Sequence, residues 1–242
     1  MITLKRKPFF ITFTENWFEY KFKWSDIFLP VCYRGLRETD QKFYFGIKKH
    51  TRTIILPIHN LIETTFSGFS TTLKYDIKKA KSQGIECYFN KDIKGFIDFY
   101  NGFAKSKKLH TLDTRRMEEF NIPEWKCSFA VLNGEILAAH SYLEDKETGI
   151  VRLMESGSLR LNNQYPSKLI AYANKLLHYY DIKYFTEQSL KFYDFGGWDD
   201  LPGLLAFKQS FGAYPINIFS YYTYLYAIKE KIRELAVALK KK

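Results

Sequence analysis

The sequence predicts a mixed α/β protein in which a central mixed sheet is flanked by helices. Segments with apolar residues at helical spacing alternate along the chain with short runs of aromatic and β-branched residues, and this order argues for a sheet covered by helices. The 242 residues are 46% hydrophobic and 18% aromatic, so the chain has ample material for a core. Asn133-Gly134, between two apolar runs, predicts a β-hairpin.

The first 66 residues are rich in residue types that favour strands. Aromatic and β-branched residues gather in four places, where we expect strands: 9–13, 17–24, 43–47 and 53–58. Pro57 ends the last of these strands or places it at a sheet edge. The segment 1–66 carries no motif of chemical interest, so we expect it to be a β-rich extension that packs on the main domain.

Helices and strands alternate from residue 67 to residue 220, which we expect to form the main domain. Four helices are expected where apolar residues recur at helical spacing: 71–83, 92–105, 167–180 and about 201–210. Thr71 or Thr72 can cap the first helix, Gly84 ends it, and Pro166 opens the third. Strands are expected in the runs between them: 85–89, 126–132, 135–144, 150–156, 182–185, 192–195 and 219–226.

The chain is basic, with 37 Lys and Arg against 26 Asp and Glu, a net charge of +11. Such a charge favours anionic partners, among which are nucleotide phosphates, nucleic acid and acidic membrane surfaces. No arginine-rich tract or aromatic RNA-binding motif is present, so the sequence does not favour nucleic acid, although tRNA stays open. A basic but inert surface is the plain alternative.

Cysteine usage and hydropathy indicate a reducing compartment. Cys32, Cys87 and Cys127 are far apart and form no zinc-ligand pattern with the five histidines, so we expect buried apolar cysteines and no metal site. The apolar stretch 9–13 is too short for a signal sequence, and no run of 18 apolar residues occurs. We expect a cytoplasmic protein, with peripheral membrane contact left open.

Four stretches resemble a known family in their order and spacing: 73–85, 132–140, 166–173 and 193–212. The last contains Asp-Phe-Gly-Gly at 194–197 and Phe-Lys-x-x-Phe-Gly at 207–212. Together the four resemble the C-terminal GNAT-like half of the Fem-type (FemAB-like) peptidoglycan bridge-forming enzymes and their shorter acetyltransferase relatives. The resemblance implies a GNAT-like sheet in a short form with one such half.

The resemblance implies an N- or O-acyltransferase. The segment 1–66 is too short for the second GNAT-like half of the long Fem enzymes, and no helical hairpin arm is present. We therefore expect acyl-CoA, with acetyl as the acyl group, as donor, and a sugar nucleotide or another cell-envelope or polysaccharide precursor as acceptor. The loop 162–167 lacks the glycines usual in acyl-CoA enzymes of this fold. An aminoacyl-tRNA-dependent transferase and a non-catalytic binding module are thus alternatives.

The resemblance also implies where the donor binds. It makes 135–144 the fourth strand of the fold, whose free backbone groups around Ala139 and Ser141 would hold the donor arm. The N-terminus of the helix 167–180 would face the donor phosphates, because unpaired N–H groups favour anions, and Ser167 and Lys168 would assist. Ordinary roles for these two side chains are a helix cap and a solvated lysine.

Acyl transfer needs a group that accepts the proton of the nucleophile. His140 is the preferred general base, because a neutral imidazole can take up a proton near pH 7. Asp194 is the second candidate and Glu155 the third. The alternatives are a hydrogen-bonded structural histidine, an aspartate that binds backbone amides near Gly196, and a solvated glutamate.

Acyl transfer also needs charge stabilisation and a surface for the acceptor. Lys208 lies between two phenylalanines, and its ammonium would meet a phosphate or the developing oxyanion. Tyr193 and Trp198 would wall a small-molecule or lipid-linked glycan acceptor. A lysine that reaches to solvent over its neighbours, and plain core packing of the two aromatic residues, are the alternatives.

The C-terminal segment 221–242 predicts a basic amphipathic helix. Its apolar residues fall at helical spacing: Leu225, Ile228, Ile232, Leu235 and Leu239. Lysines and an arginine surround them, and the chain ends in three lysines. Such a helix can lie on an anionic membrane, pack on its own domain, or pack against a second subunit in a homodimer.

Overall fold

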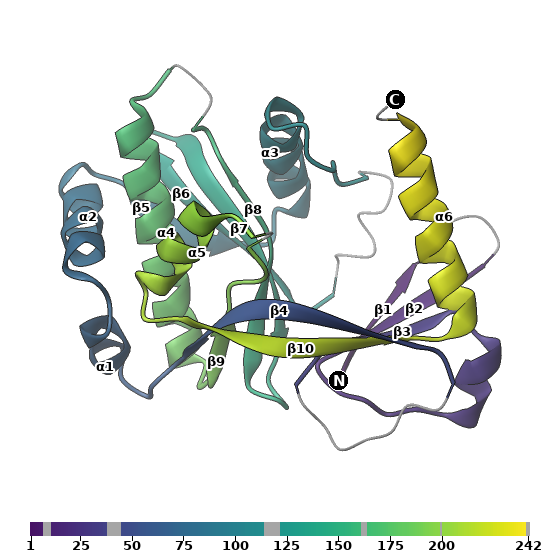
Figure 1. The fold of residues 1–242 in the computed structure, drawn as a ribbon. Helices are drawn as coiled ribbons and strands as arrows, with labels where there is room; N and C mark the ends of the chain where they lie inside the picture. The colour runs from purple at the N-terminus through teal and green to yellow at the C-terminus, as the bar shows by residue number, and fades with distance from the viewer. Residues whose placement is uncertain (7–10, 38–44, 114–121, 161–163, 199, 241–242) are drawn as a thin grey trace. The chain divides into compact units, whose positions relative to one another are not determined.

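A computed structural model describes the chain except for residues 7–10, 38–44, 114–121, 161–163, 199 and 241–242, and the side chains of 233–240 (Figure 1). The chain forms two compact units. Met1–Thr53 and Ile216–Lys242 make up the terminal unit, and Ile54–Pro215 makes up the central unit. These boundaries differ from the expected 1–66, 67–220 and 221–242. Both fall inside strands, where no change of composition marks them.

The terminal unit is built from both ends of the chain. Its elements are β1 (Ile2–Arg6), β2 (Phe13–Trp17), the 3-10 helix η1 (Trp24–Phe28), β3 (Val31–Leu36), the first part of β4 (Ile47–Pro57), most of β10 (Tyr214–Tyr222), and α6 (Tyr224–Lys240). β1 pairs antiparallel with β2, β2 parallel with β3, and β3 antiparallel with β10. The sheet thus brings the first and last strands of the chain together.

A buried carboxylate organises the interior of the terminal unit. Tyr226 of α6 donates its hydroxyl to Glu15 of β2 at 2.6 Å, and Arg6 and Arg34 lie 3.5 Å from the other carboxylate oxygen. Burial acts to raise the pKa of Glu15, but the two guanidinium groups outweigh it and the pKa lies below its usual range. The ion pairs therefore keep a buried charge in place and tie β2 to β1 and β3, and the hydrogen bond from Tyr226 ties α6 to β2.

The central unit contains a mixed sheet and its helices. Its elements are the end of β4, α1 (Ile62–Ser67), α2 (Thr71–Ser82), β5 (Glu86–Asn90), α3 (Ile93–Ser106), β6 (Trp125–Leu132), β7 (Glu135–Asp145), β8 (Ile150–Ser158), α4 (Ser167–Glu187), β9 (Phe192–Asp194) and α5 (Pro202–Gln209). The strand order is β4-β9-β8-β7-β6-β5. Only β8 and β9 run parallel among these neighbours, so the sheet is mixed and the predicted fold class is confirmed.

Helices cover both faces of the central sheet (Figure 1). α2 and α4 pack on one face, where Ile77 and Leu177 join the main core. α3 packs on the other, where Phe99 and Phe103 lie against Gly157 of β8. The sheet is therefore buried on two sides, and a substrate can reach its backbone only where a strand edge is left open.

Several predicted elements of the central unit are confirmed. Asn133 and Gly134 both have positive φ, 51° and 82°, as the hairpin turn requires. The helix expected at 71–83 is present, but its cap is Ser70, whose hydroxyl accepts from the backbone N–H of Leu73 at 3.2 Å, rather than Thr71 or Thr72.

One expected strand of the central unit is wrong. Residues 182–185 belong to α4, because Ile182 and Phe185 are buried at helical spacing and continue its apolar face. The short helix α1 is absent from the expectations.

The expected elements of the terminal unit match the structure only in part. β1 and β2 occupy 2–6 and 13–17, and a 3-10 helix occupies 24–28, where strands were expected at 9–13 and 17–24. The strand β3 was missed. Of the expected strand 43–47, residues 43 and 44 lie outside the described residues, and Ile47 is the first residue of β4. The last expected strand, 219–226, is displaced toward the C-terminus, since β10 runs from Tyr214 to Tyr222 and α6 begins at Tyr224.

Candidate functional site

The parallel strands β8 and β9 separate after a short shared run. They pair at three positions, of which Arg152 and Asp194 are the last. Beyond this point the chain follows β4, because Phe195 donates its N–H to Ile54 and Ile54 donates to Gly196. β8 continues to Ser158 and, among the strands that the structure describes, pairs there with β7 alone. Residues 153–158 thus have no second strand beside them among the strands that the structure describes, and they are here called the open segment of β8.

A β-bulge lies at the beginning of the open segment. Ser141 pairs with Glu155 and Tyr142 pairs with Leu153, so Met154 is the extra residue on β8. A bulge bends its strand and strengthens the local twist. The bulge therefore helps β8 to turn away from β9 at the position where the two strands part.

Asp194 fastens the two strands at the point of separation. Its Oδ2 lies 2.5 Å from Nη1 of Arg152, and its Oδ1 accepts from the backbone N–H of Gly196 at 2.8 Å. Gly196 has a φ of +73°, a conformation that side-chain-bearing residues rarely adopt. The carboxylate of Asp194, the second candidate base, thus stabilises the double-glycine turn.

Lys208 is buried, at 5% exposure, and extends from α5 to the same turn. Its Nζ donates to the carbonyl oxygens of Phe195 at 2.7 Å and Gly196 at 3.2 Å, and also to that of Gly197. An ammonium has three protons, and these three bonds use them. The side chain expected to meet a phosphate or an oxyanion therefore stabilises the backbone that leaves β8.

His140 lies in the core beneath α4. It is fully buried, with Nδ1 2.8 Å from Oδ2 of Asp181 and Nε2 3.0 Å from Oδ1 of Asn174. Both ring nitrogens are engaged, so the imidazole offers no lone pair to a substrate in this conformation. The preferred candidate base occupies the position of a hydrogen-bonded structural histidine.

Two tyrosines and a second histidine extend this buried network. The hydroxyl of Tyr142 donates to Asp181 at 2.6 Å and lies 2.6 Å from that of Tyr193, which in turn lies 2.9 Å from Nδ1 of His178. Burial, with the charges of His140 and Lys208, holds the pKa of His178 well below its usual range. Burial raises the pKa of both tyrosines.

The network contains a group with metal-ligand chemistry that the sequence did not indicate. Ligand atoms of His140, His178 and Asp181 lie within 4.8 Å of one another. The two imidazole rings overlap, with centroids 4.2 Å apart and planes inclined by 36°, and each already has a hydrogen-bonded Nδ1. This arrangement fits a hydrogen-bonded core better than ligands that converge on an ion.

Glu155 lies on the open segment and is half-buried. Its carboxylate hydrogen-bonds to Tyr100 of α3, and burial together with this carboxylate raises the pKa of the tyrosine. Of the three candidate bases, Glu155 is the one that the structure places beside the free edge of β8.

The free edge was expected one strand too early. Ala139 and Ser141 lie on β7, which pairs with β6 on one side and β8 on the other, so the ladder occupies this part of its backbone. The signal that identifies the correct strand is its position before the helix. Because a parallel pair needs a crossover helix, the strand that leads into 167–187 must be 150–158.

The other predicted site residues divide between surface and core. Ser167 and Lys168 are exposed at the start of α4, whose first turn has no side-chain cap. The preceding loop 162–167 lies partly outside the described residues. Tyr193 and Trp198 are buried, so neither forms the expected wall for an acceptor. Arg152 was not singled out, and a lone arginine in a strand carries no signal of its partner.

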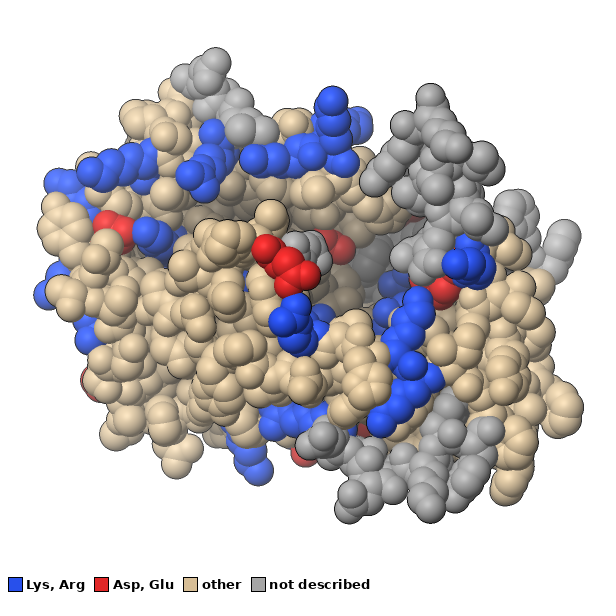
Figure 2. Space-filling model, in the orientation of Figure 1, with Lys and Arg blue, Asp and Glu red and all other residues tan. Residues whose placement is uncertain are grey.

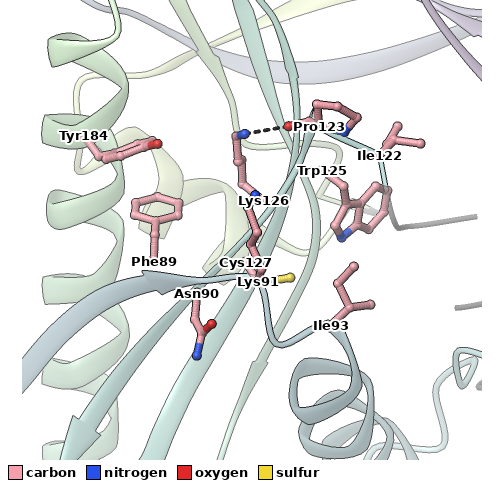
Figure 3. Close-up of a pocket in the computed structure, with 10 residues that line it drawn as sticks. All are labelled: Phe89, Asn90, Lys91, Ile93, Ile122, Pro123, Trp125, Lys126, Cys127 and Tyr184. Atoms are coloured by element: carbon pink, nitrogen blue, oxygen red, sulfur yellow. Dashed lines mark hydrogen bonds between the residues drawn. The ribbon is translucent and has the colours of Figure 1, made fainter. Parts of the chain in front are cut away.

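A pocket of about 660 Å³ lies elsewhere in the central unit (Figure 3). It is lined by residues of β5, β6 and the neighbouring helices, including Phe89, Lys91, Trp125, Lys126 and Tyr184. Lys126 donates to the carbonyl of Pro123 at 2.5 Å, as the dashed line in Figure 3 marks. None of the predicted site residues lines this pocket, so it is separate from the open segment.

Comparisons with known proteins support the fold. The sequence matches no protein-family model and no curated protein. The structure is similar to that of FemX, with a TM-score of 0.62 and 13% identity over 95% of this chain and 86% of FemX. It is also similar to L-PGS from Bacillus licheniformis, with a TM-score of 0.54 and 12% identity over 81% of this chain and 68% of that one.

A third structure is the C-terminal domain of a putative lysylphosphatidylglycerol synthetase from Agrobacterium fabrum. Its TM-score is 0.53 at 9% identity, over 86% of this chain and 72% of that one. Identities this low establish architecture rather than activity. With its mixed sheet, its separating parallel strands and these neighbours, the chain has the Fem-like GNAT fold.

Proposed function

We propose that this chain is an acyltransferase that moves an acyl group, acetyl in the simplest case, from acyl-CoA to an amino or hydroxyl group of a sugar nucleotide or another cell-envelope precursor. The open segment of β8 is the observation that supports this most strongly. The backbone groups along this edge, which no described strand covers, can pair with an extended molecule as an added strand would. The arm of coenzyme A contains amide groups, which have the donors and acceptors that such pairing needs.

The chemistry follows from what lies along this edge. The nitrogen or oxygen of the acceptor attacks the thioester carbonyl, the C–S bond breaks, and coenzyme A leaves as the thiol. Glu155 takes the proton of the attacking group and gives it to the departing thiolate sulfur. Backbone N–H groups of the open segment stabilise the negative charge on the carbonyl oxygen in the transition state.

The start of α4 supports an anionic donor. The helix follows β8 along the chain, its first turn has no side-chain cap, and Lys168 is exposed there. Uncapped N–H groups at a helix N-terminus favour phosphate groups, and a lysine nearby adds charge. A donor that lies along β8 would thus have its phosphates near this helix end.

A second candidate is a transferase that uses aminoacyl-tRNA. One of the similar structures is named as part of a putative lysylphosphatidylglycerol synthetase, and another is named L-PGS. The name lysylphosphatidylglycerol denotes a lipid that carries an amino acid. Basic side chains greatly outnumber acidic ones on the face drawn in Figure 2, as RNA binding requires. The attacked group would then be an ester carbonyl at the same edge.

A ligand panel separates these candidates. We expect an acyl-CoA to raise the melting temperature, and free thiol to appear when envelope precursors are supplied. Glu155→Gln should lower kcat by about 10²-fold to 10⁴-fold with the melting temperature nearly unchanged. Glu86→Gln, on the exposed edge strand β5, is the matched control and should leave kcat unchanged.

Other outcomes identify the alternatives. Retention of charged tRNA at low salt, without stabilisation by any thioester, would replace acyl-CoA with aminoacyl-tRNA as donor. Stabilisation by a thioester without thiol release from any acceptor pool would make the chain a binding module. An unchanged kcat in Glu155→Gln would remove the glutamate from the mechanism.

A further inference from the structure

The positive charge of the chain is concentrated in the terminal unit. Met1–Thr53 and Ile216–Lys242 contain 17 Lys and Arg against 7 Asp and Glu, a net charge of +10. The central unit, twice as long, contains 20 against 19, a net charge of +1. The formal net charge of the protein therefore comes almost entirely from the residues of one unit.

Three acidic residues of the terminal unit are withdrawn from its surface, whereas Glu19 pairs with Lys21 at 2.9 Å. Glu15, Asp26 and Glu230 are buried, Glu15 beside Arg6 and Arg34, and Asp26 bound by the hydroxyl of Tyr33 at 2.5 Å. Apart from Arg6 and Arg34, which pair with Glu15, several basic residues lie at the surface. The exposed ones on described parts of the unit are Lys5, Lys21, Lys23, Lys48, Lys49, Arg52 and Lys231.

The same unit exposes large apolar side chains. Trp24 and Phe28 of η1 are 72% and 79% exposed, and Leu29 follows them. On α6, Leu225, Ile228 and Ile232 lie on one face and are also exposed. We call these six residues the terminal apolar patch.

A hydrogen bond links the two parts of the terminal apolar patch. Thr223, directly before α6, donates its hydroxyl to the carbonyl of Leu29 at 2.7 Å and accepts from the N–H of Val31 at 3.0 Å. The end of η1 and the start of α6 are therefore neighbours. Large exposed apolar side chains on two neighbouring elements are typical of an interaction surface.

We propose that the terminal unit docks on an anionic lipid bilayer through the terminal apolar patch. An anionic bilayer offers both a negatively charged surface for the lysines and an apolar layer for the exposed apolar side chains. Its anionic headgroups attract exposed lysines such as Lys21, Lys23 and Lys231, and its acyl boundary takes up tryptophan, phenylalanine and aliphatic side chains. RNA would satisfy the charge but would leave Leu29, Ile228 and Ile232 in water. The proposal does not depend on the acyl donor of the central unit.

Trp24 provides a natural probe for this docking. The other three tryptophans, Trp17, Trp125 and Trp198, are at most 8% exposed, so quenching by iodide reports mainly on Trp24. Vesicles of phosphatidylcholine with about 30% phosphatidylglycerol should shift its emission to shorter wavelength and protect it from iodide. Vesicles of phosphatidylcholine alone should bind at least about tenfold more weakly, and about 1 M salt should release the protein.

Matched variants test the patch itself. Phe28→Ser with Ile228→Ser should weaken binding to the anionic vesicles by about tenfold or more, with an unchanged melting temperature. Leu61→Ser with Tyr75→Ser removes two equally exposed apolar side chains from the central unit, and its affinity for vesicles should stay within about twofold.

Three results would overturn the proposal. Equal binding to neutral and anionic vesicles, or none to either, excludes this surface as a site for anionic lipid. Retention of tRNA without vesicle binding assigns the charge to RNA. A dimer that protects Trp24 in the absence of lipid assigns the patch to a second copy. Thiol release with a free acceptor is measured without vesicles, so these failures are distinct from a failure of the acyltransferase.

Discussion

Arg152 and Asp194 form an ion pair across β8 and β9 at the last position where the two strands run together. Nη1 of the arginine lies 2.5 Å from Oδ2 of the aspartate, and both side chains are largely buried. One residue later the strands separate and the free edge of β8 begins. The pair therefore fastens the two strands at the position where the opening starts.

Removal of one member of this ion pair should destabilise the central unit. Arg152→Ala leaves a buried carboxylate with one partner fewer, and we expect a loss of about 2–4 kcal/mol in the free energy of unfolding. Urea titration measures this. Lys94→Ala breaks the exposed ion pair with Asp98 and should cost less than about 0.5 kcal/mol. Equal losses in the two variants would show that the buried ion pair contributes no more to the free energy of unfolding than the exposed one.

Lys208→Met should destabilise the double-glycine turn. The methionine retains most of the volume but leaves the carbonyls of Phe195, Gly196 and Gly197 without their common donor, at a cost of about 2–4 kcal/mol. Thermal unfolding checks the loss. Lys74→Met removes a lysine that caps one carbonyl near the surface and should cost below about 1 kcal/mol. If the Lys208→Met protein were as stable as the unmodified protein but had reduced turnover, the prediction would be wrong and the ammonium would act as a catalytic cation.

Gly196→Ala should be destabilising because of backbone conformation rather than crowding. The nearest atom to an added Cβ is the carbonyl oxygen of Leu153 at 3.6 Å, an ordinary contact, but φ is +73°. The left-handed conformation costs a residue with a side chain about 1–2 kcal/mol. Gly102→Ala, inside α3 with nothing near the added carbon, should instead stabilise by up to about 1 kcal/mol. We expect the denaturant midpoint of unfolding to fall in Gly196→Ala and to rise in Gly102→Ala.

Stability should decrease as the pH falls below about 6.5, because of His178. Its pKa in the folded chain lies well below 6.5, mainly through burial, so the unfolded chain binds a proton there that the folded chain does not. The free energy of unfolding then falls by up to about 1.4 kcal/mol per pH unit. Carboxyl groups such as Glu15 act only at lower pH, because its pKa lies below 4.5.

Urea titrations between pH 7 and pH 5 measure this slope. His178→Phe, in a pocket of aromatic rings, should flatten it even though the variant loses the bond to Tyr193. His110→Phe, at an exposed position, should leave the slope unchanged. An unchanged slope in His178→Phe would mean that another group binds the proton.

The sequence indicated the candidate site in part. Asp194 and Lys208 were singled out from the double glycine and its neighbours, and the structure places both at the opening of β8. Their tasks differ from the expected ones, because a side chain shows its chemistry in the sequence but not its partner. Arg152 is 42 residues from Asp194 along the chain and becomes its neighbour only through the sheet. Lys208 meets the three carbonyls only because α5 packs on the turn.

Local patterns determined the elements with strong periodicity or turn chemistry, among them the Asn133-Gly134 hairpin, the helix after Ser70 and the mixed α/β class. Long-range packing decided the rest. It extended α4 through 182–185, moved the free edge from β7 to β8, and joined the first 53 residues to the last 27 in one unit. Turn and helix propensities act over a few neighbouring residues, whereas strand pairing and burial depend on residues that are distant in sequence, so only the tertiary structure could decide them.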